Sequence, residues 1–163
     1  MMFNVIIRKS VNLIKNIHQK STYKLLYTKY GIGNENFLQG KGCEIYGDGC
    51  FYVGEYSYCG NLGGFQVVKG HKITIGSNVA ISHNVRIYTS NRNAEYFLTG
   101  NGEKISSGNV TIGNNVWIGA NVFITEGVTI DDNVVIGANS VITNDISSGC
   151  VVGGVPGKVI KKY

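Results

Sequence analysis

In the second half of the chain, isoleucine recurs with a strict period of six residues. A period of six fits neither the 3.6-residue period of an amphipathic helix nor the two-residue alternation of a simple strand. The members of this ladder are Ile112, Ile118, Ile124, Ile130, Ile136 and Ile142. A second ladder follows each isoleucine by four residues, at Val116, Val122, Val128, Val134, Ser140 and Ile146. The pattern therefore predicts an array of short structural repeats over residues 110 to 146.

Glycine and asparagine occupy fixed places between the isoleucines. Glycine follows the isoleucine directly at Gly113, Gly119 and Gly137. Asparagine takes the third place after it at Asn115, Asn121, Asn133 and Asn139. Both residue types tolerate the tight, often positive-φ backbone of a corner, and the β-branched runs between them favour short strands. Each hexapeptide is therefore interpreted as one strand and one corner, and we expect the coils to stack as an all-β solenoid with backbone amides paired from coil to coil.

The same six-residue period is present further upstream, at Ile75, Ile81 and Ile87. Before it, glycine-rich and weakly registered coils begin near residue 31, and the first clear repeat covers residues 53–58. Residues 88–109 interrupt the array without hexad spacing. A long excursion within a compact repeat is usually functional or disordered, so we expect a protruding central loop there.

The first 30 residues have a different pattern, with apolar residues among lysines and without proline. The apolar positions are Phe3, Ile6, Ile7, Leu13, Ile14, Ile17, Leu25 and Leu26. This pattern predicts one or two amphipathic helices. One interpretation is a helix packed on the open end of the solenoid or on a neighbouring subunit. The other is a basic helix on an anionic membrane surface, because residues 1–30 contain six Lys or Arg residues and no acid.

Composition adds few constraints. A length of 163 residues suits one cored domain, which we divide into an N-terminal segment at 1–40 and a β-helix at 41–163 with a tail at 147–163. Basicity without a helix-turn-helix, zinc-finger or aromatic-sheet signature argues against nucleic-acid binding.

The four cysteines lack metal-ligand spacing, which predicts reduced, buried thiols at Cys43, Cys50, Cys59 and Cys150. Without a signal peptide or a membrane-length apolar run, the expected compartment is the cytoplasm, with the inner membrane face as a possible location.

Two stretches of sequence carry a family resemblance. The repeats IGNNVW, IGANVF and IGANSV, followed by the closing segment GGVPGKVI, resemble the hexapeptide-repeat acyltransferases, which include galactoside, maltose and serine acetyltransferases and bacterial polysaccharide O-acetyltransferases. The resemblance implies a left-handed parallel β-helix with three hexapeptides in each triangular coil. It also implies a homotrimer in which active sites are shared between subunits, and a central loop that leans over the neighbouring subunit.

The resemblance further implies acetyl-CoA as acyl donor and no metal. By position, small residues would line the pantetheine arm, a Thr-Asn pair would lie nearer the nucleotide, and two tail lysines would meet the phosphates. An aromatic residue after the NNV sequence would pack near the cofactor or on the outside of a coil. These candidates are Trp117, Gly119, Ala120, Ala138, Thr143, Asn144, Lys158 and Lys161.

The sequence departs from its relatives where the catalytic base is expected. Galactoside-type enzymes have a histidine at the start of the central loop, and here Arg92 stands at that place, next to Asn91. Arginine has no lone pair that could accept a proton. We predict His83, two places after Ile81, as the general base, with Arg92 and Asn91 binding the acceptor or polarising the acetyl carbonyl.

Several alternatives to this base stay open. His71, in an inserted turn, is the rival imidazole, and we expect it on another side of the triangle from His83. His83 would otherwise cap a corner together with Asn84. Glu95 and Glu103 in the loop are weaker candidates for the base or for orienting it.

The predicted function is acetyl transfer from acetyl-CoA to a sugar hydroxyl, in capsule, O-antigen or other surface polysaccharide biosynthesis. The acceptor sugar could be free, nucleotide-linked, lipid-linked or polymeric. A nucleotide-sugar N-acetyltransferase is the alternative, although it normally has a separate N-terminal nucleotide-binding unit.

A γ-type carbonic anhydrase needs three histidines on facing coils, and one of His18, His71 and His83 falls in the N-terminal helix. A non-catalytic, ice-binding β-helix needs outward threonine ladders, which Thr111, Thr129 and Thr143 do not form.

Overall fold

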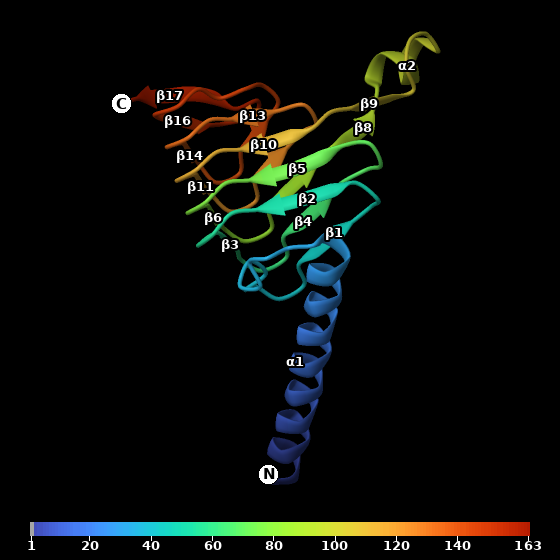
Figure 1. Ribbon diagram of the computed structural model, residues 1–163, viewed down its shortest axis with the longest axis vertical. Coiled ribbons are helices and arrows are strands. Elements are labelled where there is room, and N and C mark those ends of the chain that lie inside the picture. The colour runs from blue at the N-terminus through green and yellow to red at the C-terminus, as the bar shows by residue number, and fades with distance from the viewer. Residues whose placement is uncertain (1) are drawn as a thin grey trace.

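The computed structural model describes residues 2–163, with side chains from Ile7 onward. The side chains of Phe3 and Ile6, which entered the predicted helical pattern, lie outside the described residues. A long helix, α1 (Met2–Tyr30), leads into a stack of triangular coils, from which a loop with a short helix, α2 (Ala94–Thr99), protrudes (Figure 1).

Three parallel sheets form the faces of the coil stack. The first face contains β2 (Cys50–Val53), β5 (Lys72–Ile75), β10 (Val110–Ile112) and β13 (Thr129–Ile130). The second contains β3 (Tyr58–Cys59), β6 (Ala80–Ile81), β11 (Trp117–Ile118), β14 (Val135–Ile136) and β16 (Cys150–Gly153), and it ends with the antiparallel β17 (Lys158–Lys162). The third contains β1 (Glu44–Tyr46), β4 (Gly64–Gln66), β7 (Arg86–Tyr88), β12 (Phe123–Ile124) and β15 (Val141–Ile142). The fold is the predicted left-handed parallel β-helix.

The isoleucine ladder forms the core of this stack. Ile75 pairs with Ile112, and Ile112 pairs with Ile130, so that the same position recurs in consecutive coils of one face. The isoleucines of the ladder from residue 75 to residue 142 are at most 2% exposed. The separation is 18 residues from Ile112 to Ile130 but 37 from Ile75 to Ile112, so the central loop adds 19 residues to one coil. The predicted hexad register is confirmed.

Asparagine and glycine have different roles at the corners. Six asparagines have positive φ between 54° and 59°, at Asn78, Asn84, Asn115, Asn121, Asn133 and Asn139. The glycine that follows an isoleucine instead allows coils to approach closely. A Cβ on Gly119 would lie 2.5 Å from the backbone nitrogen of Ala138 in the next coil. Asparagine therefore provides the backbone turn of these corners, and glycine provides the space between coils.

The central loop has regular structure that the hexad pattern does not indicate. Strands β8 (Ser90–Arg92) and β9 (Ile105–Ser107) form an antiparallel hairpin that carries α2 at its tip. Asn93 caps α2 by accepting a bond from the Tyr96 backbone N–H, and Gly100 ends the helix in the left-handed region. Local capping thus orders the loop outside the coil register.

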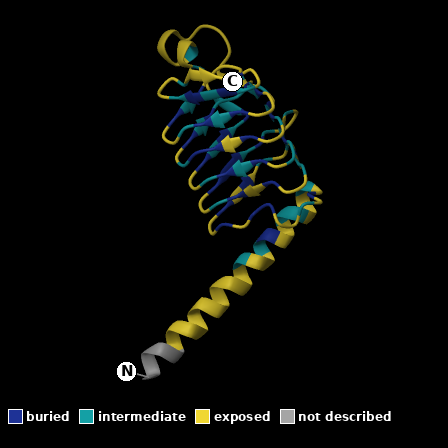
Figure 2. Cartoon of the chain, turned by 90° about the vertical axis from the view of Figure 1, so that its left-hand side faces the viewer, coloured by how far each residue is buried: buried dark blue, intermediate teal, exposed yellow. Residues whose placement is uncertain are grey.

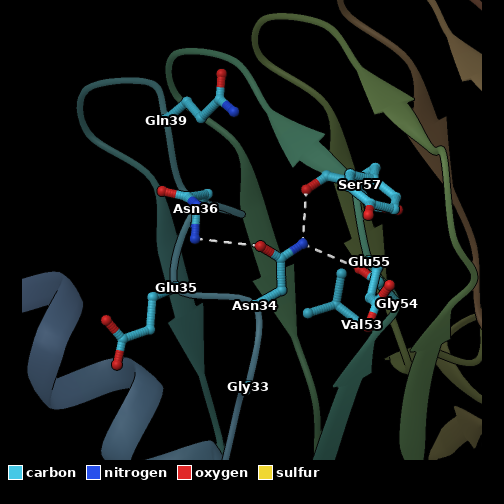
Figure 3. A pocket seen from close by; sticks show the side chains of 10 residues that line it. Gly33, Asn34, Glu35, Asn36, Gln39, Val53, Gly54, Glu55 and Ser57 are labelled. Atoms are coloured by element: carbon cyan, nitrogen blue, oxygen red, sulfur yellow. Dashed lines mark hydrogen bonds between the residues drawn. The ribbon is translucent and has the colours of Figure 1, made fainter.

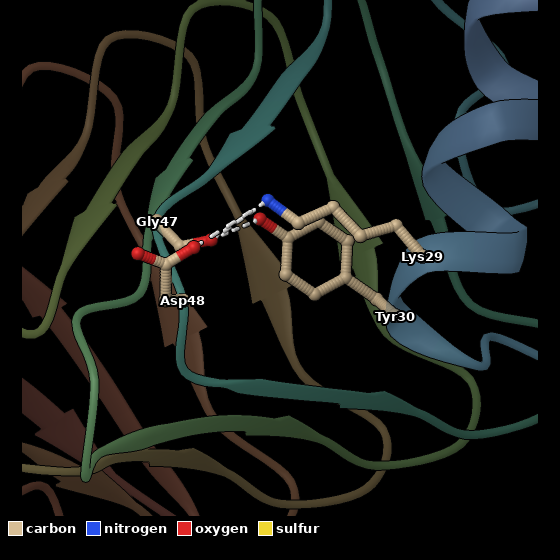
Figure 4. Close-up of polar contacts among 4 residues, drawn as sticks. All are labelled: Lys29, Tyr30, Gly47 and Asp48. Atoms are coloured by element: carbon tan, nitrogen blue, oxygen red, sulfur yellow. Dashed lines mark hydrogen bonds and ion pairs between the residues drawn. The ribbon is translucent and has the colours of Figure 1, made fainter.

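The N-terminal segment is one continuous helix, and most of it stands clear of the coils (Figures 1 and 2). Its last turns attach to the first coils through tyrosine hydroxyls. The Tyr23 hydroxyl donates to Gly40 O at 2.7 Å and accepts from Cys43 N at 3.0 Å, and the Tyr27 hydroxyl accepts from Leu38 N at 2.9 Å. Tyr30 and Lys29 both donate to Gly47 O at 2.9 Å (Figure 4). The expected packing on the open end of the solenoid is therefore present, but only at the C-terminal end of α1.

The cysteines follow the prediction in part. Cys43, Cys59 and Cys150 are free and buried, whereas Cys50 is free but exposed. The expectation of burial is wrong for Cys50 because its side chain is on the outer side of β2, where alternate residues of a strand point away from the core. None of the helices within residues 2–163 is long and apolar enough to cross a membrane.

Candidate functional site

The corners of successive coils line up as edges of the triangular prism, and two edges hold most of the predicted site residues. The first, here called the His83 edge, joins the second face to the third. Its members each follow a registered isoleucine by two residues and are His83, Ala120 and Ala138. The second, here called the loop edge, joins the third face to the first. It contains His71, both ends of the central loop, Glu126 and Asn144.

On the His83 edge, the imidazole forms a bond between coils. His83 is exposed, and its Nδ1 accepts a hydrogen bond of 2.9 Å from Asn61 N in the preceding coil. Asn114 does the same at another edge, where its Oδ1 accepts from Ser77 N at 2.8 Å. His83 therefore does cap a corner.

This bond determines the tautomer of the ring. In the neutral imidazole only one nitrogen carries the proton, so acceptance at Nδ1 places that proton on Nε2. With this tautomer, Nε2 of His83 donates. To accept a hydroxyl proton at Nε2, the ring must carry its own proton on Nδ1 instead. It then loses the hydrogen bond from Asn61 N–H.

On the loop edge, Asn91 connects the loop to the coils. Its side-chain amide donates to the carboxylate of Glu126, in the corner that follows β12. The neighbouring Arg92 is exposed and pairs in register with Ile105 across the hairpin. The structure thus places Asn91 and Arg92 one edge away from His83, with β7 between them.

His71 lies at the loop edge, one coil before the loop. Val68 N donates to Thr89 Oγ1 at 2.9 Å, and Lys72 N donates to Asn109 Oδ1 at 3.0 Å, so the turn that carries His71 is bonded to both ends of the loop. His71 and His83 are on different edges, as expected. However, it is the rival imidazole, His71, and not the predicted base His83, that shares an edge with the loop. The reason is that a six-residue step along the chain moves to another face, whereas one complete coil returns to the same edge.

The predicted cofactor residues fall into three groups. Trp117 is on the outer side of the second face with 56% of its surface exposed, next to Gly119 and the small residues of the His83 edge. Thr143 and Asn144 are exposed at the loop edge, with Asn144 Nδ2 donating to Thr143 Oγ1 at 3.1 Å. Lys158 and Lys161 are exposed on β17, which runs back along β16. One chain does not bring these groups together at a single edge.

Features outside the predicted set also occur near the loop edge. On the outer side of the third face, Tyr88 makes edge contacts with Tyr46 and Phe123 at ring-centroid distances of 6.4 and 5.1 Å. Gln66, paired with Tyr88 in register, has a buried Oε1 without a hydrogen-bond partner. Glu126 also went unrecognised in the sequence. The signal that could have found it is its place two residues after Ile124.

A wide polar hollow of about 1010 Å³ lies at the first coils (Figure 3). Asn34 bridges its wall by donating to Gly54 O and Ser57 O, and Glu35, Asn36 and Gln39 line its other side. It contains none of the predicted catalytic or cofactor residues. Within residues 2–163, no cluster of three His, Cys, Asp or Glu side chains is arranged to hold a metal ion.

Comparison with known proteins shows which proteins the chain is similar to. The family described as bacterial transferase hexapeptide (six repeats) matches residues 109–144. Galactoside O-acetyltransferase of Escherichia coli K12 is 47% identical over 96 residues, which cover 59% of this chain and 47% of that protein. The repeats are therefore those of the hexapeptide transferases, and the chain is homologous to the galactoside O-acetyltransferases. It spans about half the length of this curated relative.

Solved structures agree with this assignment. A galactoside acetyltransferase in complex with coenzyme A superposes with a TM-score of 0.62 at 37% identity, covering 78% of this chain and 64% of the other. A maltose O-acetyltransferase from Clostridium difficile 630 gives 0.55 at 39% identity, with 80% and 66% covered. A polysialic acid O-acetyltransferase gives 0.64 at 31% identity, with 77% and 59% covered.

Proposed function

We propose that this protein is an acetyl-CoA-dependent O-acetyltransferase that acts on a sugar hydroxyl in the cytoplasm, during surface polysaccharide biosynthesis. The observation that carries the proposal is the 47% identity to a galactoside O-acetyltransferase over 96 residues. The structural likeness to a polysialic acid O-acetyltransferase supports a polysaccharide as one class of acceptor. In the reaction, the acceptor oxygen attacks the thioester carbonyl, the C–S bond breaks, and the hydroxyl proton leaves through a base to the departing thiolate.

The direct test is release of free coenzyme A thiol from acetyl-CoA in the presence of a panel of acceptors. The panel contains neutral and acidic sugars, their polymers, and amino sugars. Acceptor-dependent thiol release with an ester product is expected. Release only with amino sugars would replace O-acetylation by N-acetylation, and no release with any acceptor would contradict the proposal.

The proposed donor site uses small residues beside the pantetheine and lysines beside the phosphates. Gly119 is buried and Ala120 and Ala138 are the smallest side chains along the His83 edge, so they leave room for an extended arm. Lys158 and Lys161 present exposed ammonium groups on β17. The coenzyme A complex of the galactoside acetyltransferase supports this assignment.

We expect Lys158→Ala combined with Lys161→Ala to weaken acetyl-CoA binding by roughly tenfold or more, because charge-assisted phosphate contacts are lost. Isothermal titration calorimetry measures the change. Lys162→Ala is the matched control, since Lys162 is also exposed on β17 but pairs with Cys150, whereas Lys161 and Lys158 pair with Val151 and Gly153. The irregular register between β16 and β17 therefore puts Lys162 on the other side of the strand from both. Unchanged affinity in the double variant would remove both lysines from the site.

For the base, we propose His83, which must exchange its bond to Asn61 N–H for the acceptor hydroxyl. His71 is the second candidate, because it shares the loop edge with Asn91. In this scheme Asn91 and Arg92 bind the acceptor or polarise the acetyl carbonyl.

We expect His83→Ala to lose at least about 100-fold in kcat while acetyl-CoA still binds. His83→Asn tests the role as a base apart from the role as a corner cap. Asn114, at the equivalent position of another corner, shows that an asparagine there can accept the backbone N–H. If His83 is the base, both variants should be inactive. If His83 only caps the corner, His83→Asn should keep the activity that His83→Ala loses. If His71→Ala alone abolishes turnover, the base is His71.

A further inference from the structure

One side of α1 carries exposed apolar residues that the coils leave uncovered. With 3.6 residues per turn, positions 7, 11, 14 and 25 fall within an arc of about 60°. The exposed fractions of Ile7, Val11, Ile14 and Leu25 are 46%, 42%, 66% and 72%. We call these four residues the apolar stripe; Leu13 and Ile17, which are 60% and 57% exposed, lie about 120° and 80° from Ile7 on the side of Lys24. Figure 2 shows α1 exposed along most of its length.

The apolar stripe points away from the solenoid. The hydroxyls of Tyr23 and Tyr27, which attach α1 to the first coils, lie roughly 160° to 200° around the helix from Ile7. Attachment through these tyrosines therefore uses the opposite side of α1, and Lys29, about 40° from Ile7, reaches Gly47 O only in the last turn. The stripe remains free in the folded chain.

Cations flank the apolar stripe on both sides. Lys15 and Arg8 lie roughly 80° to 100° from Ile7 in one direction, and Lys24 lies about 100° in the other. The sequence has no acidic residue before Glu35. Among the flanking cations Arg8, Lys15 and Lys24, none forms an ion pair within the described part of the chain.

The partner of this surface must combine negative charge with an apolar layer. A second copy of α1 offers the apolar stripe but only like charges, and His18 and Ser21 interrupt the seam such a contact would need. An anionic polymer satisfies the cations but leaves Ile14 and Leu25 in water. An anionic phospholipid surface meets both requirements, because acyl chains lie directly beneath the phosphates.

We propose that α1 binds the surface of anionic membranes, with the apolar stripe at the boundary of the acyl chains and Arg8, Lys15 and Lys24 at the headgroup phosphates. The central loop and β17 lie at the end of the molecule opposite the N-terminus (Figure 1). Membrane binding through α1 therefore leaves both of them accessible. The proposal does not depend on the transferase activity.

The test is flotation of the full chain with vesicles of phosphatidylcholine alone or with about one third phosphatidylglycerol. We expect binding to the anionic vesicles, and weaker binding as salt rises from about 0.1 M to about 1 M. Ile7→Gln with Ile14→Gln should reduce binding by roughly tenfold or more, because glutamine keeps helix propensity but removes apolar area. Arg8→Gln with Lys15→Gln and Lys24→Gln should reduce binding to anionic vesicles to the level seen with phosphatidylcholine alone.

The matched control is Phe97→Gln with Leu98→Gln on α2, where the exposed fractions are 72% and 81%. This control should bind anionic vesicles as the unmodified chain does. An equal loss in the control would indicate nonspecific adsorption and overturn the proposal. If the unmodified chain does not bind vesicles, the proposal is overturned. A smaller mass of the Ile7→Gln, Ile14→Gln variant in sedimentation would then show that the apolar stripe is a contact between subunits.

Discussion

At the residue scale, six corners of the coils depend on an asparagine whose backbone lies in the left-handed region. That region costs most L-residues roughly 1 to 2 kcal/mol, and asparagine tolerates it best among residues with a side chain. The side chains also bond from coil to coil: Asn84 Nδ2 donates to Asn121 Oδ1 at 2.9 Å, and Asn121 Nδ2 donates to Asn139 Oδ1 at 3.0 Å. One residue type thus provides both the turn and a bonded ladder along the edge.

We expect Asn121→Ala to lower the free energy of unfolding by about 1 to 3 kcal/mol, because alanine adds strain at a φ of 59° and breaks both ladder bonds. Urea unfolding followed by circular dichroism measures this. Asn121→Gly removes the same bonds without the backbone strain. Its free energy of unfolding should therefore lie between those of the unmodified chain and of Asn121→Ala. Equal stability of the Ala variant and the unmodified chain would show that the corner asparagine is dispensable.

At the scale of elements, the junction between α1 and the coils depends on buried phenol groups. Tyr23 is 7% exposed, and its hydroxyl satisfies both Gly40 O and Cys43 N. Burial is the main reason that the pKa of Tyr23 is raised to about 12, since the charged phenolate is disfavoured there. The neutral phenol is therefore the form that stabilises this junction.

We expect Tyr23→Phe to cost about 1 to 3 kcal/mol of stability, because the buried Cys43 N loses its partner and Gly40 O keeps only the bond from Gln19 Nε2. The stabilisation by the phenol is complete below its unfolded pKa of 10 and is lost as pH rises through about 12. The stability difference between the unmodified chain and Tyr23→Phe should therefore narrow over that range. Denaturant unfolding from pH 8 upward measures it, and Tyr56→Phe, at a residue 79% exposed, should have little effect. A difference that stays constant up to pH 12 would contradict this role.

At the scale of the whole molecule, the division of candidate residues between two edges favours an assembly. A site that uses the His83 edge together with the loop edge needs the edges of two neighbouring subunits. Closed threefold symmetry would bring unlike edges together at every interface and limit growth to three chains. The proposed site therefore requires an interface between subunits, which the proposed homotrimer would supply at each of its three contacts.

Sedimentation should give the mass of three 17.7 kDa chains at micromolar concentration. Mixed trimers of His83→Ala and Asn91→Ala subunits should recover about a quarter of the unmodified rate, because random assembly leaves one interface in four with both edges intact. Mixtures as inactive as the separate variants would place the site within one chain. An active monomer would refute the trimer and the shared site together.

Local pattern was sufficient to predict the core and the N-terminal helix. The six-residue spacing from Ile75 to Ile142 determined which side chains are buried, since a buried ladder must repeat with the coil. These features depend on neighbours a few residues apart, and the sequence expresses such relations directly.

The tertiary structure alone decided how the candidate site is distributed. His71 shares an edge with the loop because a bond from Val68 N to Thr89 Oγ1 crosses 21 residues of chain. Likewise, the bond from Asn61 N determines the tautomer of His83, and it depends on the register between β3 and β6. Which side of α1 meets the coils depends on hydroxyls that reach Gly40 and Leu38. Such contacts form between segments that are distant in sequence, so no periodicity of apolar residues could have revealed them.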